Sequence, residues 1–410
     1  MAKTVLLIGT FDTKGEEFAF VRDQIEANGC SVLLMDIGVL EDPTIAPDIS
    51  AEEVAQAGGS SLTSLRRQAD RTEAFEVMTE GIKKMTPRLY EEGAFDGVLS
   101  LGGGSGTMMA TAAMRELPLG VPKLMVSSVA SGDISAYVDI KDLTFMYSVA
   151  DIAGLNRLTR NILANAAGAI CGMVQRQEVD QKDQPLVAAT MFGVTTPCVT
   201  RVRGKLEDAG YEVVVFHATG TGGRTMELMI REGLVTGVAD VTTTEWCDEV
   251  AGGFLSAGPD RLSAAGQAGI PQVVSCGALD MVNFFAPDTV PEKYRSRNLF
   301  NHTSTVTLMR TSPEECREIG KRIAGKLNQS TGPTALMIPL KGVSKIDNEG
   351  EAFFDPEADK ALFDALQEHT NENILLKELN LHINDKEFAD AIADQLLTFL
   401  NHQQTELNQE

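Results

Sequence analysis

The chain has 410 residues, of which 43% are apolar and 23% charged, as is typical of a globular protein too long for a single hydrophobic core. The formal net charge of −23 argues against nucleic acid as a partner, because phosphate backbones are bound by surfaces rich in Lys and Arg. The first residues lead into a predicted strand without a signal peptide, and no apolar run is long enough to span a bilayer. We therefore expect a cytoplasmic protein with no membrane partner.

The first half of the chain alternates between predicted strands and helices. Short apolar runs predict buried strands at 5–9, 32–36, 98–101 and 123–127. Apolar residues at helical spacing predict helices at 16–27, 71–90, 108–116 and 156–174. Residues 42–64 contain Pro, Gly and Ser and are expected to form an excursion over the surface. This alternation is typical of a doubly wound sheet.

The polar segment 177–184 separates this half from a second one in which the pattern restarts. Strands are predicted there at 186–190, 211–216, 237–241, 272–275, 306–309 and 335–338. Helices are predicted at 196–209, 226–232 and 385–404. When the two halves of the chain are aligned so that Gly29 matches Gly210, Asp36 matches His217. The order strand, helix, glycine, strand therefore recurs at the same spacing in both halves, through duplication or through convergence. We predict an α/β protein of two Rossmann-like three-layer domains, 1–181 and 182–410, whose mostly parallel sheets face each other across a cleft.

The strongest motif is the glycine-rich loop at residues 101–107 (LGGGSGT), between a predicted strand and a predicted helix. Successive glycines allow the backbone to approach a ligand and to adopt positive φ, and the helix start adds unpaired N–H groups with a partial positive charge. Ser105 and Thr107 offer hydroxyl groups. A tight turn is the structural alternative, but four glycines in five positions exceed what a turn needs. The motif therefore favours phosphate binding.

The turn at residues 10–15 follows the first strand, at the edge where open α/β sheets bind ligands. Lys14 offers a charge to a phosphate and Thr13 a hydroxyl, while Asp12 is suited either to hold Mg²⁺ or to cap the helix. Arg71 can swing toward the same pocket or remain a solvated surface residue. Neither a Walker A loop nor a G-x-G-x-x-G fingerprint is present, which argues against a P-loop and against a Rossmann dinucleotide site.

These motifs also carry a resemblance to a known family. Residues 8–14 (IGTFDTK) and 101–107 together resemble an uncharacterised protein family of bacteria and fungi, whose domain also forms the N-terminal part of the plant tobamovirus-resistance protein. Further matching stretches lie at 257–262 (AGPDRL), 277–284 (GALDMVNF) and 305–311 (TVTLMRT). The resemblance implies two Rossmann-like subdomains with ATP bound in the first.

The same resemblance implies a set of nucleotide contacts, to which Arg71 is matched by its place at the start of a helix. A further family contact falls near residues 48–50, where no single residue matches securely. The expected contacts are Asp12, Thr13, Lys14, Arg71, Gly103, Gly104, Ser105 and Gly106.

The second half of the chain offers a candidate substrate site. Residues 219–225 form a second glycine-rich loop that opens a helix, and Arg224 can grip a carboxylate or phosphate with two N–H groups. Polar residues follow other predicted strands, and we expect them to converge on the edge that faces the first domain. The residues expected to bind substrate are Gly222, Gly223 and Arg224.

Chemically reactive side chains follow several strands of this half. Cys247 and Cys276 are nucleophile candidates only if a base adjoins them. For each reactive residue, a helix cap, a packed thiol or a solvated side chain is the structural alternative. The acid/base candidates are Glu245, Asp280 and His302.

Three functions are compatible with these patterns. The first is an ATP-binding protein with a small-molecule site in the interdomain cleft, the second a hydrolase or lyase that acts on a small organic acid without ATP, and the third a non-catalytic, ATP-gated regulatory protein. The expected cofactor is ATP, with Mg²⁺ as an option. The six cysteines lack C-x-x-C and zinc spacing, so no metal site is predicted. A homodimer is expected from the apolar face of the last helix, although packing within the chain would explain that face equally well.

Overall fold

The computed structural model describes residues 2–177 and 184–407. The chain divides into two compact units, residues 1–180 and 181–410. The predicted boundary between residues 181 and 182 falls in a segment outside the described residues. Within the described ranges, no helix is long and apolar enough to cross a membrane.

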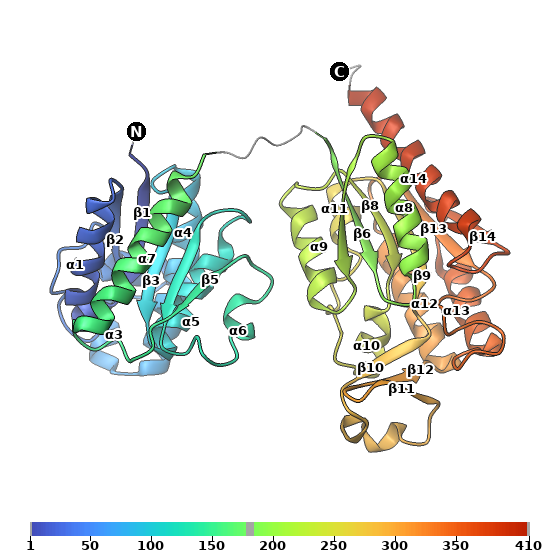
Figure 1. Ribbon diagram of the computed structural model, residues 1–410, viewed down its shortest axis with the longest axis horizontal. Helices are drawn as coiled ribbons and strands as arrows, with labels where there is room; N and C mark the ends of the chain where they lie inside the picture. Colours follow the sequence, from blue (N-terminus) through green and yellow to red (C-terminus); the bar gives the residue numbers. More distant parts are fainter. Residues whose placement is uncertain (1, 178–183, 408–410) are drawn as a thin grey trace. The chain divides into compact units, whose positions relative to one another are not determined.

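The N-terminal unit is a five-stranded parallel sheet with helices on both faces, in the strand order β2-β1-β3-β4-β5 (Figure 1). Its strands are β1 (Thr4–Gly9), β2 (Ser31–Asp36), β3 (Gly97–Gly102), β4 (Lys123–Ser127) and β5 (Thr144–Tyr147). Its helices are α1 (Phe11–Ala27), α2 (Ala51–Ala57), α3 (Leu62–Gln68), α4 (Arg71–Glu91), α5 (Gly104–Glu116), α6 (Ser135–Val138) and α7 (Arg157–Gln175).

The central strands of this sheet are buried on both faces, which explains why they are continuous apolar runs. In β1, Val5 and Leu7 pack with residues of α1 and α7, while the alternate residues Leu6 and Ile8 pack with residues of α2, α4 and α5. All four side chains are fully buried. The starts of α4 and α5 therefore lie on the same side of the sheet, at the edge formed by the carboxyl ends of the strands.

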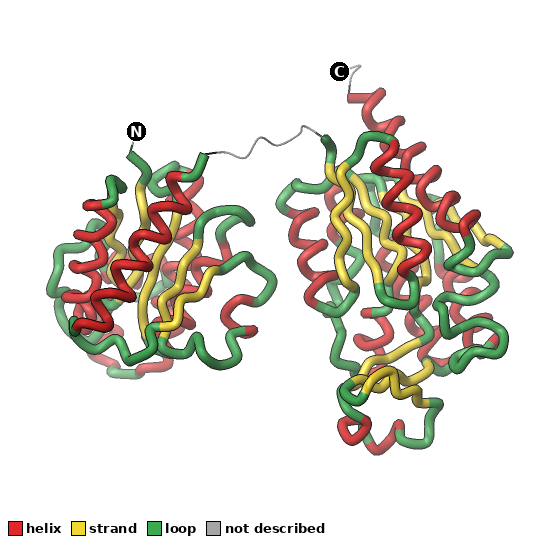
Figure 2. Tube along the Cα trace, in the orientation of Figure 1, coloured by secondary structure: helices red, strands yellow, loops and turns green. Residues whose placement is uncertain are grey.

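The C-terminal unit contains a six-stranded parallel sheet, β14-β13-β9-β8-β6-β7, and a separate antiparallel sheet, β10-β12-β11, beyond the carboxyl ends of the parallel strands (Figure 2). The parallel strands are β6 (Leu186–Met191), β7 (Glu212–His217), β8 (Gly237–Thr242), β9 (Gln272–Gly277), β13 (Thr334–Pro339) and β14 (Leu375–Leu379). The antiparallel strands are β10 (Met281–Phe284), β11 (Leu299–Thr303) and β12 (Val306–Arg310). The strand predicted at 306–309 is thus β12, which lies outside the parallel sheet.

Seven α-helices lie within the described part of this unit. The last of them, α14, buries its apolar face against α8, β8, β9 and β13 of its own unit. That face therefore gives no support to a homodimer. The helices are α8 (Thr196–Asp208), α9 (Thr221–Arg231), α10 (Glu245–Ala251), α11 (Ala264–Ala268), α12 (Pro313–Leu327), α13 (Pro356–His369) and α14 (Lys386–Leu407).

The two parallel sheets share one topology, as the repeated unit in the sequence predicts. Gly29 and Gly210 both adopt positive φ, at 79° and 94°, and each precedes the second strand of its unit by two residues. In both units the first strand lies between the second and the third. Chain connections leave such a first strand in opposite directions, which creates a switch point where open α/β sheets bind ligands.

Three helices begin earlier than the sequence predicts, because their starts are polar or rich in glycine and carry no apolar periodicity. Helix α1 begins at Phe11, α5 at Gly104 and α9 at Thr221. The excursion predicted at 42–64 is also wrong in part, since it contains α2 and the start of α3. Both glycine-rich loops are therefore the first turns of helices.

Candidate functional site

A cavity of about 520 Å³ lies at the switch point of the N-terminal unit, beside the carboxyl ends of β1 and β2. The polar lining residues come from Thr10 after β1 and from the first turns of α1, α4 and α5. The apolar ones come from the loop after β2 and from the next turns of α4 and α5. A mixed lining and this volume are typical of small-molecule sites. The lining residues are Thr10, Asp12, Thr13, Ile37, Val39, Leu40, Arg71, Thr72, Ala74, Phe75, Met78, Ser105 and Met109.

Helix α5 begins at this cavity without a side-chain cap. The first hydrogen bond of the helix joins the Thr107 N–H to the Gly103 carbonyl at 2.9 Å. Among the described residues, the N–H groups of Gly104, Ser105 and Gly106 have no hydrogen-bond partner. Three adjacent amides are thus available to an external acceptor, and the helix dipole favours a negatively charged one.

The glycines of this loop leave open space. A Cβ atom on Gly104 would meet no atom within 4 Å, and a Cβ on Gly103 or Gly106 would come no closer than 3.7 or 4.0 Å to its nearest neighbour. The expectation of positive φ is wrong, because none of these residues adopts it. Internal packing therefore does not account for the three glycines, whereas the close approach of a ligand to the backbone would.

Thr107 does not serve as a ligand contact. Its side chain is fully buried, and its hydroxyl lies 2.6 Å from the Ser127 hydroxyl. The sequence-based suggestion that this hydroxyl faces a phosphate is therefore wrong, because a threonine one turn into the helix points at the neighbouring strand β4.

Asp12 lines the cavity and fastens the loop that follows β2. Its Oδ2 accepts hydrogen bonds from the amides of Leu40 and Glu41 at 2.9 and 3.3 Å. Its Oδ1 is buried and has no hydrogen-bond partner among the described residues. Thr13 is exposed and donates its hydroxyl proton to Thr10 at 2.9 Å. The Asp12 carboxylate therefore has one buried oxygen without a partner, and a Cβ on Gly38 would lie 2.5 Å from that oxygen.

The start of α1 has an acceptor within the protein. The Phe11 amide donates to the Asp36 carboxylate at 3.0 Å, and the Gly38 amide donates to the same oxygen at 2.9 Å. Burial raises the pKa of Asp36. The Lys14 ammonium donates to the carbonyl of Ile152, and Lys14 does not line the cavity. The Asp36 carboxylate thus takes the first amide of α1, whereas three adjacent amides at the start of α5 have no acceptor among the described residues.

Two arginines near the cavity differ in their partners. Arg66 braces the loop after β2 through Val39 and Asp42, at 3.1 and 3.0 Å. Arg71 is exposed and makes no hydrogen bond or ion pair with any described residue. Arg71 is therefore a cation at the cavity that is available to an anionic ligand.

The segment 48–50, where a family contact was expected, supports the local fold. The Asp48 carboxylate accepts from the Leu34 amide at 2.8 Å. Ser50 caps α2 through the Glu53 amide at 3.3 Å, and the Glu53 carboxylate accepts in return from the Ser50 amide at 2.8 Å. Neither Asp48 nor Ser50 lines the cavity.

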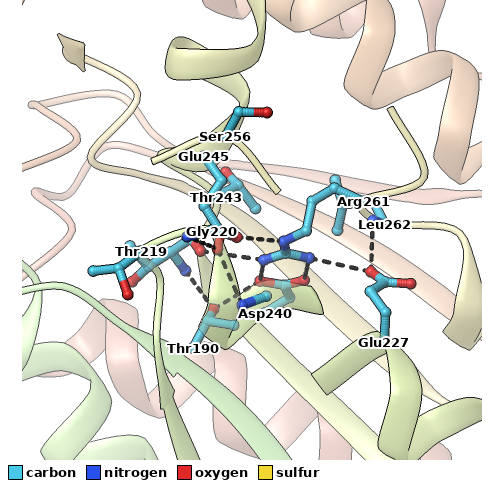
Figure 3. Close-up of polar contacts among 12 residues, drawn as sticks. Thr190, Thr219, Gly220, Glu227, Asp240, Thr243, Glu245, Ser256, Arg261 and Leu262 are labelled. Atoms are coloured by element: carbon cyan, nitrogen blue, oxygen red, sulfur yellow. Dashed lines mark hydrogen bonds and ion pairs between the residues drawn. The ribbon is translucent and has the colours of Figure 1, made fainter. Parts of the chain in front are cut away.

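In the C-terminal unit, a glutamate occupies the start of α9 (Figure 3). One oxygen of Glu245 accepts from the amides of Gly220 and Gly223 at 2.8 and 3.0 Å, and the other accepts from Arg261 Nε at 2.6 Å. Burial raises the pKa of Glu245, and the neighbouring Arg261 opposes that shift. Glu245 thus occupies the amide of Gly223, a predicted substrate contact, together with the amide of Gly220.

The glycines of this second loop are explained by close internal contacts. A Cβ on Gly222 would lie 1.9 Å from the His217 carbonyl oxygen, and a Cβ on Gly223 would lie 2.3 Å from the Glu245 carboxylate. Arg224, the remaining predicted substrate contact, is half-buried. Gly222 and Gly223 are therefore required by packing, in contrast to Gly104.

Arg261 lies at the centre of a buried ion cluster that the sequence analysis missed. Its guanidinium donates two hydrogen bonds to Asp240, at 2.5 and 2.7 Å, and lies 3.5 Å from Glu227. Glu227 in turn accepts from the amides of Leu262 and Ala264, each at 2.7 Å. The only signal in the sequence is the stretch 257–262, which contains Arg261 but gives no sign that its side chain is buried.

The other two acid/base candidates have separate surroundings. Asp280 is fully buried, accepts from the Ser344 hydroxyl at 2.7 Å, and leaves Oδ1 without a partner among the described residues. Burial, reinforced by Asp347, raises the pKa of Asp280 to about 7. His302 is exposed on β11. Within the described ranges, no hydrogen bond or ion pair joins any two of Glu245, Asp280 and His302.

The two candidate nucleophiles are packed thiols. Cys247 and Cys276 are at most 1% exposed, and burial raises the pKa of both. A raised pKa disfavours the thiolate, which is the nucleophilic form of cysteine. No group of three or more metal-ligating side chains is found among the described residues.

Comparison with known proteins confirms the resemblance seen in the sequence. The "Uncharacterised protein family (UPF0261)" matches with its N-terminal domain over residues 3–179 and with its C-terminal domain over residues 184–400. A UPF0261 protein of Clostridium tetani (strain Massachusetts / E88) is 53% identical over 402 residues, covering 98% of this chain and 100% of that protein.

A plant protein is also similar to this chain. The ToMV resistance protein Tm-1(GCR237) of Solanum lycopersicum is 37% identical over 416 residues, covering 96% of this chain and 55% of that protein. Among solved structures, a UDP-N-acetylglucosamine 2-epimerase from Rickettsia bellii aligns over 98% of both chains at 10% identity, with a TM-score of 0.24, too low to carry an argument. The two matched domains and these identities show that the chain belongs to the uncharacterised protein family UPF0261.

Proposed function

We propose that the N-terminal unit binds a nucleotide, ATP, in the cavity at its switch point, with the phosphates at the start of α5. The observation that carries this proposal is the empty space at Gly104, beside three amides that have no acceptor among the described residues. Amides at a helix start, with glycines that let a ligand approach the backbone, are suited to phosphate oxygens.

The charges at the cavity support a polyphosphate ligand. Arg71 offers five N–H donors and has no partner among the described residues. The negative charge of Asp12 repels a bare anion, but a carboxylate that lines the cavity is suited to a Mg²⁺ ion carried by the phosphates. Mg²⁺ is commonly held by one or two carboxylates together with substrate phosphates, so a single aspartate is sufficient here.

The apolar wall supports a ligand with a flat, weakly polar part. Phe75 and Met78 lie one and two turns below Arg71 on α4, and Met109 lies one turn below Ser105 on α5. A base stacked between these side chains would be removed from water while the phosphates stay at the helix starts. This division of the lining matches the two parts of a nucleotide.

The proposal is limited to binding. The tomato relative is named a ToMV resistance protein, but this chain spans only 55% of that protein, and nothing in the cavity bears on such a role. The alternative of an acid-binding hydrolase or lyase is not favoured, because Glu245 fills the loop that was expected to hold the acid. ATP-gated regulation without catalysis stays a prediction.

Calorimetric titration of the full chain with ATP and Mg²⁺ tests the proposal. In the Gly104→Val variant, the added side chain enters the space reserved for the ligand, so ATP binding should be lost. Gly168→Val is the matched control, since Gly168 lies in α7 of the same unit and its Cβ would also meet no atom within 4 Å. The control should bind ATP as the wild type does. Equal binding by all three proteins, or no binding by the wild type, would contradict the proposal.

A further inference from the structure

We infer that Gly220, Gly223 and Arg261 form a carboxylate-binding site in the C-terminal unit, and that Glu245 is the ligand built into it. The site does not depend on the proposed nucleotide site, which belongs to the other unit. A small external carboxylate, such as formate, is the class of ligand that would take the site if the Glu245 side chain were removed.

The geometry is that of a bound carboxylate. Both oxygens of Glu245 are used: Oε1 accepts from two amides at 2.8 and 3.0 Å, and Oε2 accepts from Arg261 Nε at 2.6 Å (Figure 3). Donors of this kind, a helix start and a guanidinium, are those that proteins use for external oxyanions. The Glu245 carboxylate therefore stands where the carboxylate of a ligand would stand.

The donors are held by contacts that do not involve Glu245. Arg261 is fixed by two hydrogen bonds to Asp240, and Asp240 accepts another from Thr190 at 2.7 Å. Gly220 adopts a φ of 81°, and a Cβ there would lie 2.7 Å from the Ser256 carbonyl oxygen. The loop and the guanidinium are thus positioned by the fold and should persist without the glutamate side chain.

In the wild type this site is closed to solvent. Glu245 and Arg261 are each 1% exposed, and Glu227 is 4% exposed. Removal of the Glu245 side chain would leave two buried amides and one guanidinium N–H without an acceptor, and the protein would lose stability. An anion small enough to fill the space left by the side chain should restore that stability.

Trp246 provides a local reporter for the test. It is the single tryptophan of the chain, it follows Glu245 in α10, and it is 2% exposed. Urea unfolding of the full chain, followed by Trp246 fluorescence, therefore reports on the C-terminal unit alone. Sodium formate is compared with sodium chloride at equal ionic strength, so that general salt effects cancel.

Glu245→Ala opens the site, whereas Glu245→Gln keeps it filled with a neutral side chain of the same size. In Glu245→Ala, formate should raise the folding equilibrium constant in proportion to its concentration above the dissociation constant, by about tenfold once its concentration is ten times that constant. The wild type and Glu245→Gln should respond equally to the two salts. A Glu245→Ala protein that folds only in formate supports the proposal as well.

Three results would overturn the proposal. The first is the same formate response in Glu245→Ala and Glu245→Gln, which would be a general effect of the salt. The second is a folded Glu245→Ala protein that does not respond to formate. The third is a Glu245→Ala protein that folds in neither salt while Glu245→Gln folds, because the donors would then depend on the glutamate for their positions.

Discussion

The carboxylate of Glu245 accepts a hydrogen bond from the amide of Gly223 at 3.0 Å, so the glycine-rich start of α9 is closed by the chain itself. The corresponding feature of the N-terminal unit, the start of α5 at Gly104, has no such internal acceptor among the described residues. Two loops with similar composition thus differ in the acceptors available to their amides. Ser105 of the N-terminal loop also lines a cavity.

Arg71→Ala should weaken the binding of ATP by about tenfold, because a hydrogen bond to a charged group contributes about 1.5 kcal/mol or more. The loss should be largest for ATP and absent for adenosine, since the guanidinium is proposed to contact phosphate. Calorimetry with ATP, ADP and adenosine measures it. Arg115→Ala is a suitable control, since Arg115 bonds to the carbonyl of Ala136 outside the cavity. An equal loss of affinity for adenosine would show that Arg71 does not contact the phosphates.

Asp12→Asn should make the binding of ATP independent of Mg²⁺. The amide oxygen can still accept from Leu40 and Glu41, so the loop should stay in place, while the charge that attracts the cation is removed. Titrations with ATP in Mg²⁺ and in EDTA measure the effect. If the wild type and the variant show the same difference between the two buffers, Asp12 does not hold the cation.

Asp248→Asn should flatten the dependence of stability on pH between about 4 and 7. Burial raises the pKa of Asp248 to about 7, so the folded state keeps a proton that the unfolded state has released. Stability from this group is therefore present at low pH and is lost as the pH rises to about 7.

Asn283 should be able to form hydrogen bonds with the asparagine side chain of the Asp248→Asn variant. It donates both its amide and its side-chain nitrogen to Asp248 at 2.9 Å, and its own Oδ1 is buried without a partner among the described residues. A flip of the Asn283 side chain would offer that oxygen to the side-chain N–H group that the substitution introduces. Urea unfolding followed by Trp246 fluorescence at about pH 4 to 7 measures the slope of the unfolding free energy against pH. A slope unchanged in the variant would assign the pH dependence to other groups.

Arg261→Met should destabilise the C-terminal unit by about 3–5 kcal/mol, because it leaves three buried carboxylates without their cation. Arg203→Met is the matched control, since the Arg203–Glu207 pair is exposed and such pairs contribute about 0–1 kcal/mol. The free energy of unfolding in urea, reported by Trp246, compares the two. Equal losses would mean that the cluster is not a central element of the fold.

The sequence predicted the layered fold well, because continuous apolar strands and amphipathic helices depend on local patterns. It also identified the loop at Gly104, since consecutive glycines before a helix are visible without a structure. The sequence did not predict the apolar wall of the cavity, because an apolar residue at helical spacing, such as Met78, has the pattern of a core residue. Whether a side chain like Met78 lines a core or a cavity depends on what packs opposite it.

The contacts of Glu245 with the glycine-rich loop of α9 could not be predicted from the sequence. Glu245 follows a strand, as catalytic carboxylates often do, and nothing nearby in the sequence indicates that it reaches Gly220 and Gly223. Arg261, which compensates the charge of Glu245, lies 16 residues further along the chain. The partners of a buried charge are set by tertiary contacts, and a single sequence does not reveal them.

A crystal structure of the full chain with a non-hydrolysable ATP analogue would locate the bound nucleotide. We expect phosphate oxygens within hydrogen-bonding distance of the amides of Gly104, Ser105 and Gly106, the Arg71 guanidinium turned toward them, and the base against Phe75 and Met78. An analogue bound elsewhere, with those amides facing solvent or a side chain, would contradict this expectation.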